Sequence, residues 1–346
     1  MLSAEILKVG SGDVGKKYPG GETAALELLH LRVQLEEKTF AKNEFMPNQT
    51  VPDLMGKPMS MSPYLRFGCI SVHRMFWMIR DTYCKVNSAE VAPTYLTSQL
   101  IWREFFYTMS ATNPMYNRMK GNPICLQIDW YDDDESYQKW VQGKTGFPWI
   151  DAIMIQLHKE GWIHQVCRHA VSSFLTRGDL WISWEKGFDT FEKHLLDADW
   201  SVCAGNWMWL SSSAFEKFLQ CPNCFCPVRY GRRMDPSGEY IKSFLPVLKN
   251  MPLKYLFEPW KAPLKVQEEA KCIVGKDYPK PMVKHSDVSK RNKKHMNDVM
   301  QVFKDIVVNH CAPSSEQEVY DLTWLPEIDL ERPTKCTADE FCTKVH

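Results

Sequence analysis

Apolar residues recur three and four positions apart along most of this chain, and this periodicity restricts the fold more than any other feature. The clearest example lies between Phe147 and Thr176, where Pro148 suits a first helical turn and Gly161 suits a helix end. The buried face of this helix is expected to carry Ile150, Ile153, Met154 and Leu157. Strand-like alternation is scarce everywhere, so the sequence predicts an all-α fold class.

The same periodicity predicts further helices and divides the chain into three parts. Helices are expected over residues 22–42, 65–83, 99–110, 162–175, 181–196 and 197–213. Residues 10–21 are rich in Gly and Lys, and residues 47–63 contain four prolines, so both predict loops. Beyond about Val308 the periodicity gives way to Pro, Ser and Glu. We therefore predict a linker remnant at residues 1–20, one helical domain at 21–308 and a C-terminal tail at 309–346.

The charge balance and the apolar pattern exclude some partners. Lys and Arg together number 42 and Asp and Glu also number 42, whereas nucleic-acid binders usually carry a basic excess. DNA binding is therefore expected to be weak or absent. No apolar run approaches the roughly 20 residues of a membrane span, so no membrane partner is expected. Twelve cysteines without a signal peptide predict free thiols in the cytoplasm or nucleus.

Three smaller motifs carry little weight. One C-x-x-C lies within Cys221, Cys224 and Cys226, but no second pair lies at zinc-finger spacing, so ordinary thiols are favoured and no metal site is predicted. The basic run at residues 290–294 is interpreted as a solvated helix face, with a nuclear-import patch as the alternative. Residues 60–68 combine hydroxyls with a Pro turn before a helix, which is a weak pattern for an anion site.

The densest group of reactive side chains lies at a junction between two predicted helices. Two carboxylates, a thiol and an amide stand close together there, at Asp197, Asp199, Cys203 and Asn206. From these residues alone, a ligand site, a metal site, a helix cap and a solvated loop all stay open. A buried arginine needs an acidic partner, and Asp197 is a candidate partner for Arg168.

Tryptophan is unusually frequent, with thirteen residues in the chain. Trp181 and Trp184 are three apart on one predicted helix, and Trp207 follows the acidic junction directly. A row of indoles can relay single electrons from a buried redox cofactor to the surface, because an indole can be oxidised transiently. Core packing is the alternative interpretation of each tryptophan.

Three segments are specific when they are taken together. They are SPYLRFGCIS at residues 62–71, QLIWREFFYTMS at residues 99–110 and the stretch at residues 176–209 that contains DADWSVCAGNW. These segments resemble the FAD-binding domain of the photolyase/cryptochrome family, and the resemblance extends from Tyr18 to about Met300. It is strongest to the insect-type, light-sensing cryptochromes, because related photolyases are expected to carry Asn where this chain has Cys203.

The resemblance implies a photolyase-type FAD-binding helical domain with a short C-terminal tail. By position, Arg32 and Ser60 would approach the phosphates of a U-shaped FAD. Asp199 would face the flavin imide and Cys203 would face the flavin N5 atom, while the protein tunes the chemistry that the cofactor performs. The full set of cofactor-binding residues implied by the resemblance is Arg32, Ser60, Met61, Ser62, Gln99, Gln165, Arg168, Asp197, Ala198, Asp199, Cys203 and Asn206.

The family pattern also implies a photochemical route. A neutral thiol with a pKa of about 8.5 is a weak donor, so light is expected to add an electron to the flavin without a proton from Cys203. The electron would come from Trp207, then Trp184, then Trp130, with Trp181 as an outer member.

Two departures from the family pattern bear on function. Family members that repair (6-4) photoproducts carry histidines at the positions of Gln165 and His169, and a glutamine cannot donate a proton near neutral pH. The family also has an N-terminal α/β domain that this sequence lacks. A truncated isoform, an incomplete gene model or an excised piece would explain its absence, and the face that it covers would be exposed.

The last residues resemble the insect-type tail. Residues 314–319, followed by residues 322–324, would lie in the groove that photolyases use for a flipped lesion, with Trp324 in the lesion pocket. Flavin reduction would then release the tail and expose a binding face.

The predicted function is an FAD-dependent blue-light photoreceptor of the circadian clock, not an enzyme. Its expected partners are the clock protein Timeless and a ubiquitin-ligase adaptor, in the cytoplasm and the nucleus. The alternatives are a (6-4) DNA photolyase, which Gln165, Cys203 and the tail disfavour, and a light-independent clock transcriptional repressor, which Cys203 and Trp324 disfavour.

Overall fold

The protein is helical in the part of the chain that the structure describes. The computed structural model describes residues 18–41, 52–55, 59–92, 97–214 and 225–310, with side chains as far as residue 301. Within these ranges the regular elements are helices, and two isolated bridges pair Tyr131 with Ile182 and Val274 with Tyr278. The predicted all-α fold class is confirmed.

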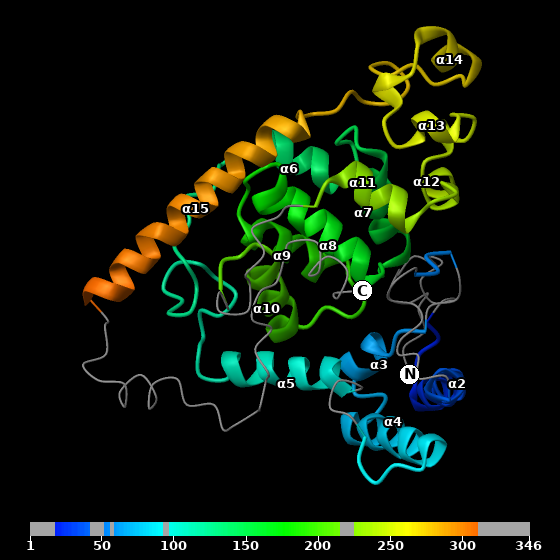
Figure 1. Cartoon of the computed structure of the whole chain (residues 1–346), viewed down its shortest axis with the longest axis vertical. Helices are drawn as coiled ribbons and strands as arrows, with labels where there is room; N and C mark the ends of the chain where they lie inside the picture. The colour runs from blue at the N-terminus through cyan, green and yellow to red at the C-terminus, as the bar shows by residue number, and fades with distance from the viewer. Residues whose placement is uncertain (1–17, 42–51, 56–58, 93–96, 215–224, 311–346) are drawn as a thin grey trace, which may run out of the picture.

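The helices follow the order labelled in Figure 1. The longer ones are α2 (Glu22–Phe40), α4 (Val72–Asn87), α5 (Ser98–Ser110), α7 (Pro148–Glu160), α8 (Gln165–Ser173), α9 (Trp184–His194), α10 (Trp200–Leu210) and α15 (His285–His310). The shorter ones are α3 (Ser62–Arg66), α6 (Asp134–Val141), α11 (Pro227–Met234), α12 (Glu239–Phe244), α13 (Leu253–Leu256) and α14 (Leu264–Glu269). A π-helical turn, η2 (Phe174–Gly178), continues α8, and two 3-10 turns are η4 (Pro246–Leu248) and η5 (Pro259–Lys261).

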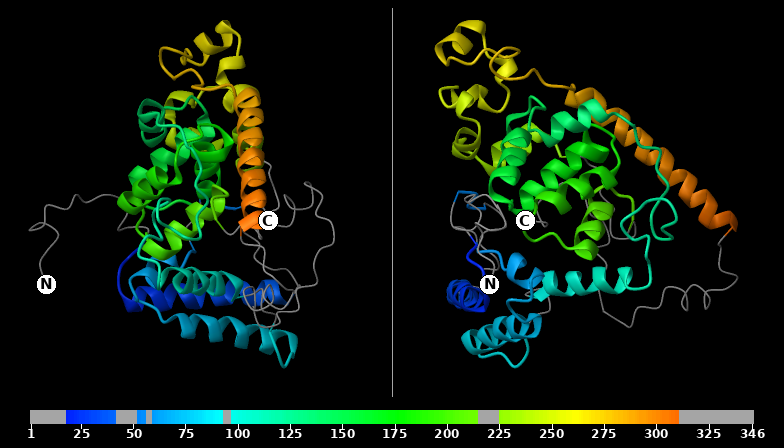
Figure 2. Two further views of the ribbon diagram at one scale, coloured as in Figure 1. Left: turned by 90° about the vertical axis from the view of Figure 1, so that its left-hand side faces the viewer. Right: turned by 180° about the vertical axis from the view of Figure 1, so that it is seen from behind.

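The helices form a central bundle with additions at both ends. Helices α7 to α10 lie in the middle, α2 and α4 lie together at one end, and α13 and α14 lie at the other (Figures 1 and 2). Helix α15 runs along one side of the bundle and contacts η2. The main core fills the bundle, and a second core joins α2, α3 and α4 through residues such as Leu29, Met61 and Ile79. The site described below lies between α8, α9 and α10.

Capping residues move some helix boundaries away from the predicted ones. The predicted helix at residues 65–83 is two helices, because α3 ends at Arg66 and the Ser71 side chain caps the start of α4. The predicted helix at residues 162–175 begins only at Gln165. The predicted starts were wrong because a capping side chain decides where a helix begins, whereas apolar periodicity only shows which face is buried.

The predicted helix at residues 181–196 also begins late, at Trp184. Ser183 is its N-cap and accepts a hydrogen bond from the backbone N–H of Glu185 at 3.2 Å. Trp181 lies outside the helix in the left-handed region, with φ of 58°. The helical spacing proposed for Trp181 and Trp184 is therefore wrong, although both side chains are buried.

Helix α15 runs as far as His310, two residues beyond the predicted end of the helical domain at 308. The division into linker, domain and tail stays a prediction, because residues 1–17 and 311–346, including Trp324, lie outside the described part of the chain. The basic run at residues 290–294 lies on α15, where its three lysines are exposed, as expected for a solvated helix face.

Close packing of α9 on α10 depends on a glycine. A Cβ atom added at Gly187 on α9 would overlap the indole ring of Trp207 on α10. Likewise, a Cβ atom at Gly205 would overlap the ring of Phe106 on α5. These two glycines therefore set how closely α10 approaches its neighbours, and the position of α10 decides where its polar residues lie.

We predict that Gly187→Ala lowers the free energy of unfolding by about 1–2 kcal/mol. The added Cβ would overlap the Trp207 ring, so the overpacking cost should be near the upper end of about 1–3 kcal/mol, and the gain of roughly 1 kcal/mol from Ala in a helix offsets part of it. Urea unfolding followed by circular dichroism measures this change. Gly20→Ala is the matched control, because no heavy atom lies within 4 Å of the added Cβ there. Equal stability of the Gly187→Ala chain and the wild type would show that the α9–α10 contact is looser than described.

Candidate functional site

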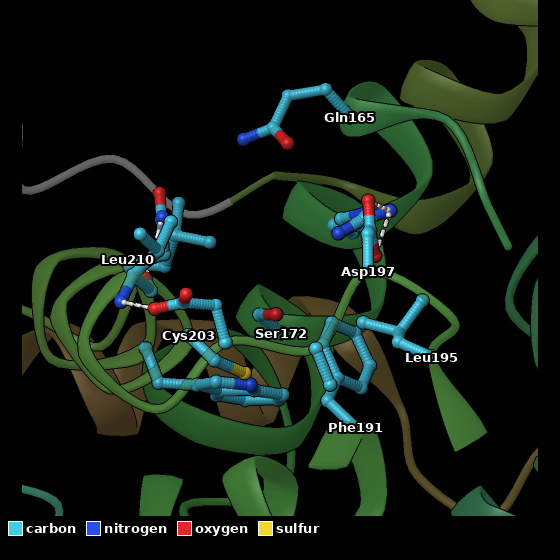
Figure 3. Close-up of a pocket in the computed structure, with 13 residues that line it drawn as sticks. Gln165, Ser172, Phe191, Leu195, Asp197, Cys203 and Leu210 are labelled. Carbon is cyan, nitrogen blue, oxygen red and sulfur yellow. Dashed lines mark hydrogen bonds and ion pairs between the residues drawn. The ribbon is translucent and has the colours of Figure 1, made fainter. Parts of the chain in front are cut away.

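A hollow of about 440 Å³, measured out to its open mouth, lies between α8, α9 and α10. Figure 3 shows Gln165 on one side of it and Cys203 and Phe191 on the opposite side, with Asp197 at a third side. The lining residues are Gln165, Arg168, Ser172, Phe191, Leu195, Asp197, Ala198, Asp199, Val202, Cys203, Asn206, Trp207 and Leu210. Its lining is divided between apolar walls and polar side chains that converge on one space, as in small-molecule and cofactor sites.

One ion pair joins α8 to the junction between α9 and α10. The Arg168 guanidinium donates from one nitrogen to both oxygens of Asp197, at 3.0 and 2.8 Å. The Asp197 side chain is 2% exposed and that of Arg168 is 19% exposed, so the pair is largely removed from water. A buried carboxylate needs such a partner, and the predicted pairing is confirmed in geometry.

Hydroxyl groups extend this ion pair toward α3. Ser62, the first residue of α3, donates its hydroxyl hydrogen to Asp197 across 2.5 Å. The Ser60 hydroxyl lies 2.8 Å from that of Ser62. Ser60 and Ser62 thus reach the site through Asp197, although neither lines the hollow.

Asp199 begins α10 and fixes its direction. One carboxylate oxygen of Asp199 accepts a hydrogen bond from the backbone N–H of Val202 at 3.1 Å, which is an N-cap. The other oxygen accepts a hydrogen bond from the Tyr107 hydroxyl on α5. Burial, together with the bond to Asp199, raises the pKa of Tyr107 to about 12, so Tyr107 is a donor at neutral pH. The helix predicted at residues 197–213 begins at Trp200, three residues later than predicted, because Asp199 is its N-cap.

Cys203 lies one turn after Asp199 and faces the hollow. Burial raises the pKa of its thiol far above the usual range and outweighs the lowering effect of Arg168. The thiol is therefore un-ionised at neutral pH, as the sequence argument requires. Asn206 follows at the next turn and donates its amide hydrogen to the backbone oxygen of Val202 at 2.8 Å.

The first residues of α8 form one side of the mouth. Gln165 is exposed there, and its amide nitrogen lies 2.9 Å from Nε2 of His169. His164 is the N-cap of α8, and its Nδ1 accepts from the backbone N–H of Val166 at 3.3 Å. Burial, aided by the charge of Arg168, lowers the pKa of His164 to about 4, which keeps the ring neutral and able to accept.

Other predicted cofactor residues lie away from the hollow. Arg32 lies on α2, where it pairs with Glu36 at 2.9 Å. Met61 is buried in the core of α2, α3 and α4, and Gln99 is exposed on the first turn of α5. Ala198 does line the hollow, and its backbone oxygen accepts a hydrogen bond from Arg66. The predicted contacts of Arg32, Met61 and Gln99 with a cofactor stay predictions.

Of the predicted tryptophans, Trp181, Trp184 and Trp207 are buried, whereas Trp130 is partly buried. Trp207 lines the hollow, and its ring makes an edge contact with Trp140 at a centroid distance of 6.3 Å. The ring centroids of Trp130 and Trp181 lie 4.8 Å apart. Trp184 is fully buried on α9, but within the described part of the chain its ring is not stacked on that of Trp207.

Sequence reasoning missed several contributors. Tyr107 contacts the site from 92 residues upstream of Asp199, and no local signal marks such a contact. Trp140 is on α6, a short helix whose pattern was not recognised. The apolar walls come from Phe191, Leu195 and Leu210, and helical spacing could have placed the first two on the buried face of α9 and the loop after it.

The described residues form neither a metal-binding cluster nor a membrane-spanning helix. In the described part of the chain, no group of three or more His, Cys, Asp or Glu residues is placed to hold a metal ion. Cys226 lies at the start of α11, whereas Cys221 and Cys224 fall outside the described residues. Among the helices in the described ranges, none is both long enough and apolar enough to cross a bilayer.

Comparisons with known proteins agree with this geometry. Residues 95–298 match the family model described as the FAD binding domain of DNA photolyase. The chain is 50% identical to cryptochrome-1 of Aedes aegypti over 327 residues, which are 92% of this chain and 60% of the mosquito protein. It is 52% identical to cryptochrome-1 of Gallus gallus over 284 residues, which are 82% of this chain and 45% of the bird protein. The chain thus spans about 60% of the mosquito relative's length.

Solved structures show the same fold. A bacterial class III photolyase from Agrobacterium tumefaciens matches with a TM-score of 0.69 and 28% identity, over 84% of this chain and 58% of that one. A Synechocystis cryptochrome matches with a TM-score of 0.68 and 26% identity, over 80% of this chain and 56% of that one. Since the family model covers more than half of the chain, this protein belongs to the photolyase/cryptochrome family and contains its FAD-binding domain.

Proposed function

We propose that this chain is the flavin-binding part of a blue-light photoreceptor that signals rather than repairs DNA. The observation that carries the proposal is the convergence of the Arg168–Asp197 ion pair, Asp199 and Cys203 on one hollow. Single features of this kind have ordinary structural explanations. Their arrangement around one hollow is much harder to explain by packing alone.

The residues of the hollow suit the ring system of FAD. Phe191 and Leu195 offer apolar contact, while Asp199 and Asn206 offer polar atoms for a group with both donors and acceptors. When bound, FAD supplies absorption of blue light and acceptance of a single electron. The Arg168 guanidinium also reaches the hollow, where Asp197 offsets its charge.

Cys203 has a defined role in this proposal. The residue is half-buried, its thiol is un-ionised, and a thiol is a weak hydrogen-bond donor. At neutral pH it therefore holds its proton and does not release it into the hollow. A carboxylic acid at this position would be a far better proton donor, so Cys203 favours electron transfer without proton transfer.

Two groups of indoles support an electron relay. Trp207 lines the hollow and Trp184 is buried on the neighbouring helix α9. Trp130 and Trp181, which precede both in the sequence, are in contact with each other, and Trp130 also packs against the main core. Trp140 contacts Trp207 directly, so a branch through Trp140 is a second candidate route.

The mouth of the hollow supports signalling over repair. Gln165 lies there beside His169, and an amide has no proton to donate near neutral pH. A repair reaction that needs a proton donor from this position would therefore lack one. The clock partners, the release of the tail that carries Trp324 and the location in cytoplasm and nucleus remain predictions of the same proposal.

We predict that the purified chain shows flavin absorption bands that bleach under blue light with an added reductant, and that Trp207→Phe slows this photoreduction at least tenfold. The reason is that phenylalanine is much harder to oxidise than tryptophan. Time-resolved absorption measures the rate. Trp149→Phe is the matched control, because Trp149 is equally buried but packs against Tyr240 and does not line the hollow.

Photoreduction at the wild-type rate in Trp207→Phe would remove Trp207 from the relay. Trp140→Phe then tests the branch, since it breaks the ring contact with Trp207. Absence of flavin bands in a folded wild-type chain would contradict the proposed cofactor itself, whatever the tryptophans do.

We also predict that Asp197→Asn lowers the free energy of unfolding by about 3 kcal/mol, because it leaves the charge of Arg168 without its partner. The same variant should retain less flavin, which the ratio of visible to ultraviolet absorbance reports. Glu135→Gln is the control, since it breaks a surface pair with Lys139 and should change stability by about 0.5 kcal/mol or less. Full flavin retention in Asp197→Asn would show that the ion pair is not needed for flavin binding.

A further inference from the structure

The wall of the hollow that α8 forms carries one buried hydroxyl, that of Ser172. This residue lines the hollow together with Gln165 and Arg168 of the same helix. The three positions are separated by three and four residues, so they lie on one face of α8. Figure 3 shows Ser172 between Cys203 and Asp197, which come from α10 and the turn before it. The hydroxyl is therefore placed among the polar groups that surround the hollow.

The Ser172 hydroxyl lacks the hydrogen bond that a buried polar group needs. The residue is fully buried, and within the described part of the chain its Oγ atom has no hydrogen-bond partner. Its backbone oxygen does have one, because it accepts from the Thr176 hydroxyl at 2.7 Å. A buried hydroxyl without a partner is destabilising, and folded proteins usually satisfy such groups with protein, water or a ligand. Because burial removes Ser172 from bulk water, a partner can reach its hydroxyl only through the hollow.

The next residue, Ser173, separates the effect of burial from the effect of the hollow. Ser173 is 2% exposed, and its hydroxyl likewise has no hydrogen-bond partner among the described residues. Helical geometry turns its side chain about 100° away from that of Ser172. It lies beside Gly178 instead, where an added Cβ atom would be 2.9 Å from the Ser173 Oγ atom. The two serines thus share a helix and a degree of burial, and of the two Ser172 is the one that lines the hollow.

We propose that Ser172 is a specificity-determining residue whose hydroxyl forms a hydrogen bond with a nitrogen or oxygen atom of the ring held in the hollow. The inference rests on the proposed function, in which that ring is the isoalloxazine of FAD. A hydroxyl can donate and accept, so it can pair with either kind of polar ring atom. The Cys203 thiol on α10 is only a weak donor, so Ser172 supplies the stronger hydrogen bond of the two.

A binding role for Ser172 gives stability and affinity opposite responses to its removal. In a flavin-stripped chain the Ser172 hydroxyl is a buried group without a protein partner, so removing it should stabilise the fold. In the complex the same change leaves a ring atom without its partner, so binding should weaken. A serine with a purely structural role behaves differently, because removing its hydroxyl lowers stability and affects binding only through the fold.

The test combines urea unfolding of the flavin-stripped full chain with FAD titration followed by flavin fluorescence. We expect Ser172→Ala to raise the urea midpoint by about 0.3–0.5 M, because it removes an unpaired buried hydroxyl and alanine is the better helix former. The same variant should bind FAD about tenfold more weakly, because a polar ring atom then enters the hollow without a partner.

Ser173→Ala is the matched control, and it should raise the urea midpoint in the same way while leaving the FAD affinity unchanged. Wild-type affinity in Ser172→Ala overturns the inference and leaves the proposed function standing. Equal weakening in both variants also overturns it, and so does a lower urea midpoint in Ser172→Ala, since the hydroxyl would then have a structural partner. If the folded wild type shows no saturable binding of FAD, the proposed function fails and this inference fails with it.

Discussion

The ion pair between Arg168 and Asp197 is the interaction on which the site depends. It joins α8 to the turn between α9 and α10, and through the Ser62 hydroxyl it reaches α3 at the N-terminal end of the molecule. A carboxylate with 2% of its surface exposed is costly without a cation, so the pair fixes the relative positions of these elements. The hollow lies between these elements, and its side chains line the space without filling it.

Helix α10 places the functional side chains that follow its acidic N-cap on one face. Asp199 satisfies the backbone at the start of the helix, and Cys203 and Trp207 follow at successive four-residue steps, which place them on the same side. Gly187 allows the Trp207 ring to lie flush against α9. The polar groups and the indole that serve the proposed cofactor are thus positioned by ordinary helix geometry, and their specificity comes from where α10 starts.

Much of this arrangement was predictable from the sequence, and the exceptions have physical reasons. The pairing of Arg168 with Asp197 followed from the rule that a buried arginine needs an acid. The start of α10 did not, because the sequence left a cap and a ligand site as alternatives for Asp199, and it serves as a cap while also lining the hollow. Tyr107 was missed because its contact spans distant parts of the chain, and Trp181 was placed on a helix although its backbone is left-handed.

The central claim is that the space between α8, α9 and α10 holds the isoalloxazine ring of FAD beside Trp207. Titration of the flavin-stripped chain with FAD, followed by flavin fluorescence, tests it most directly, because an indole next to the ring quenches its emission. The account predicts saturable binding of about one FAD per chain with strong quenching, and recovery of emission in Trp207→Phe at unchanged stoichiometry. Binding with undiminished fluorescence in the wild type, or no saturable binding by a folded chain, would contradict it.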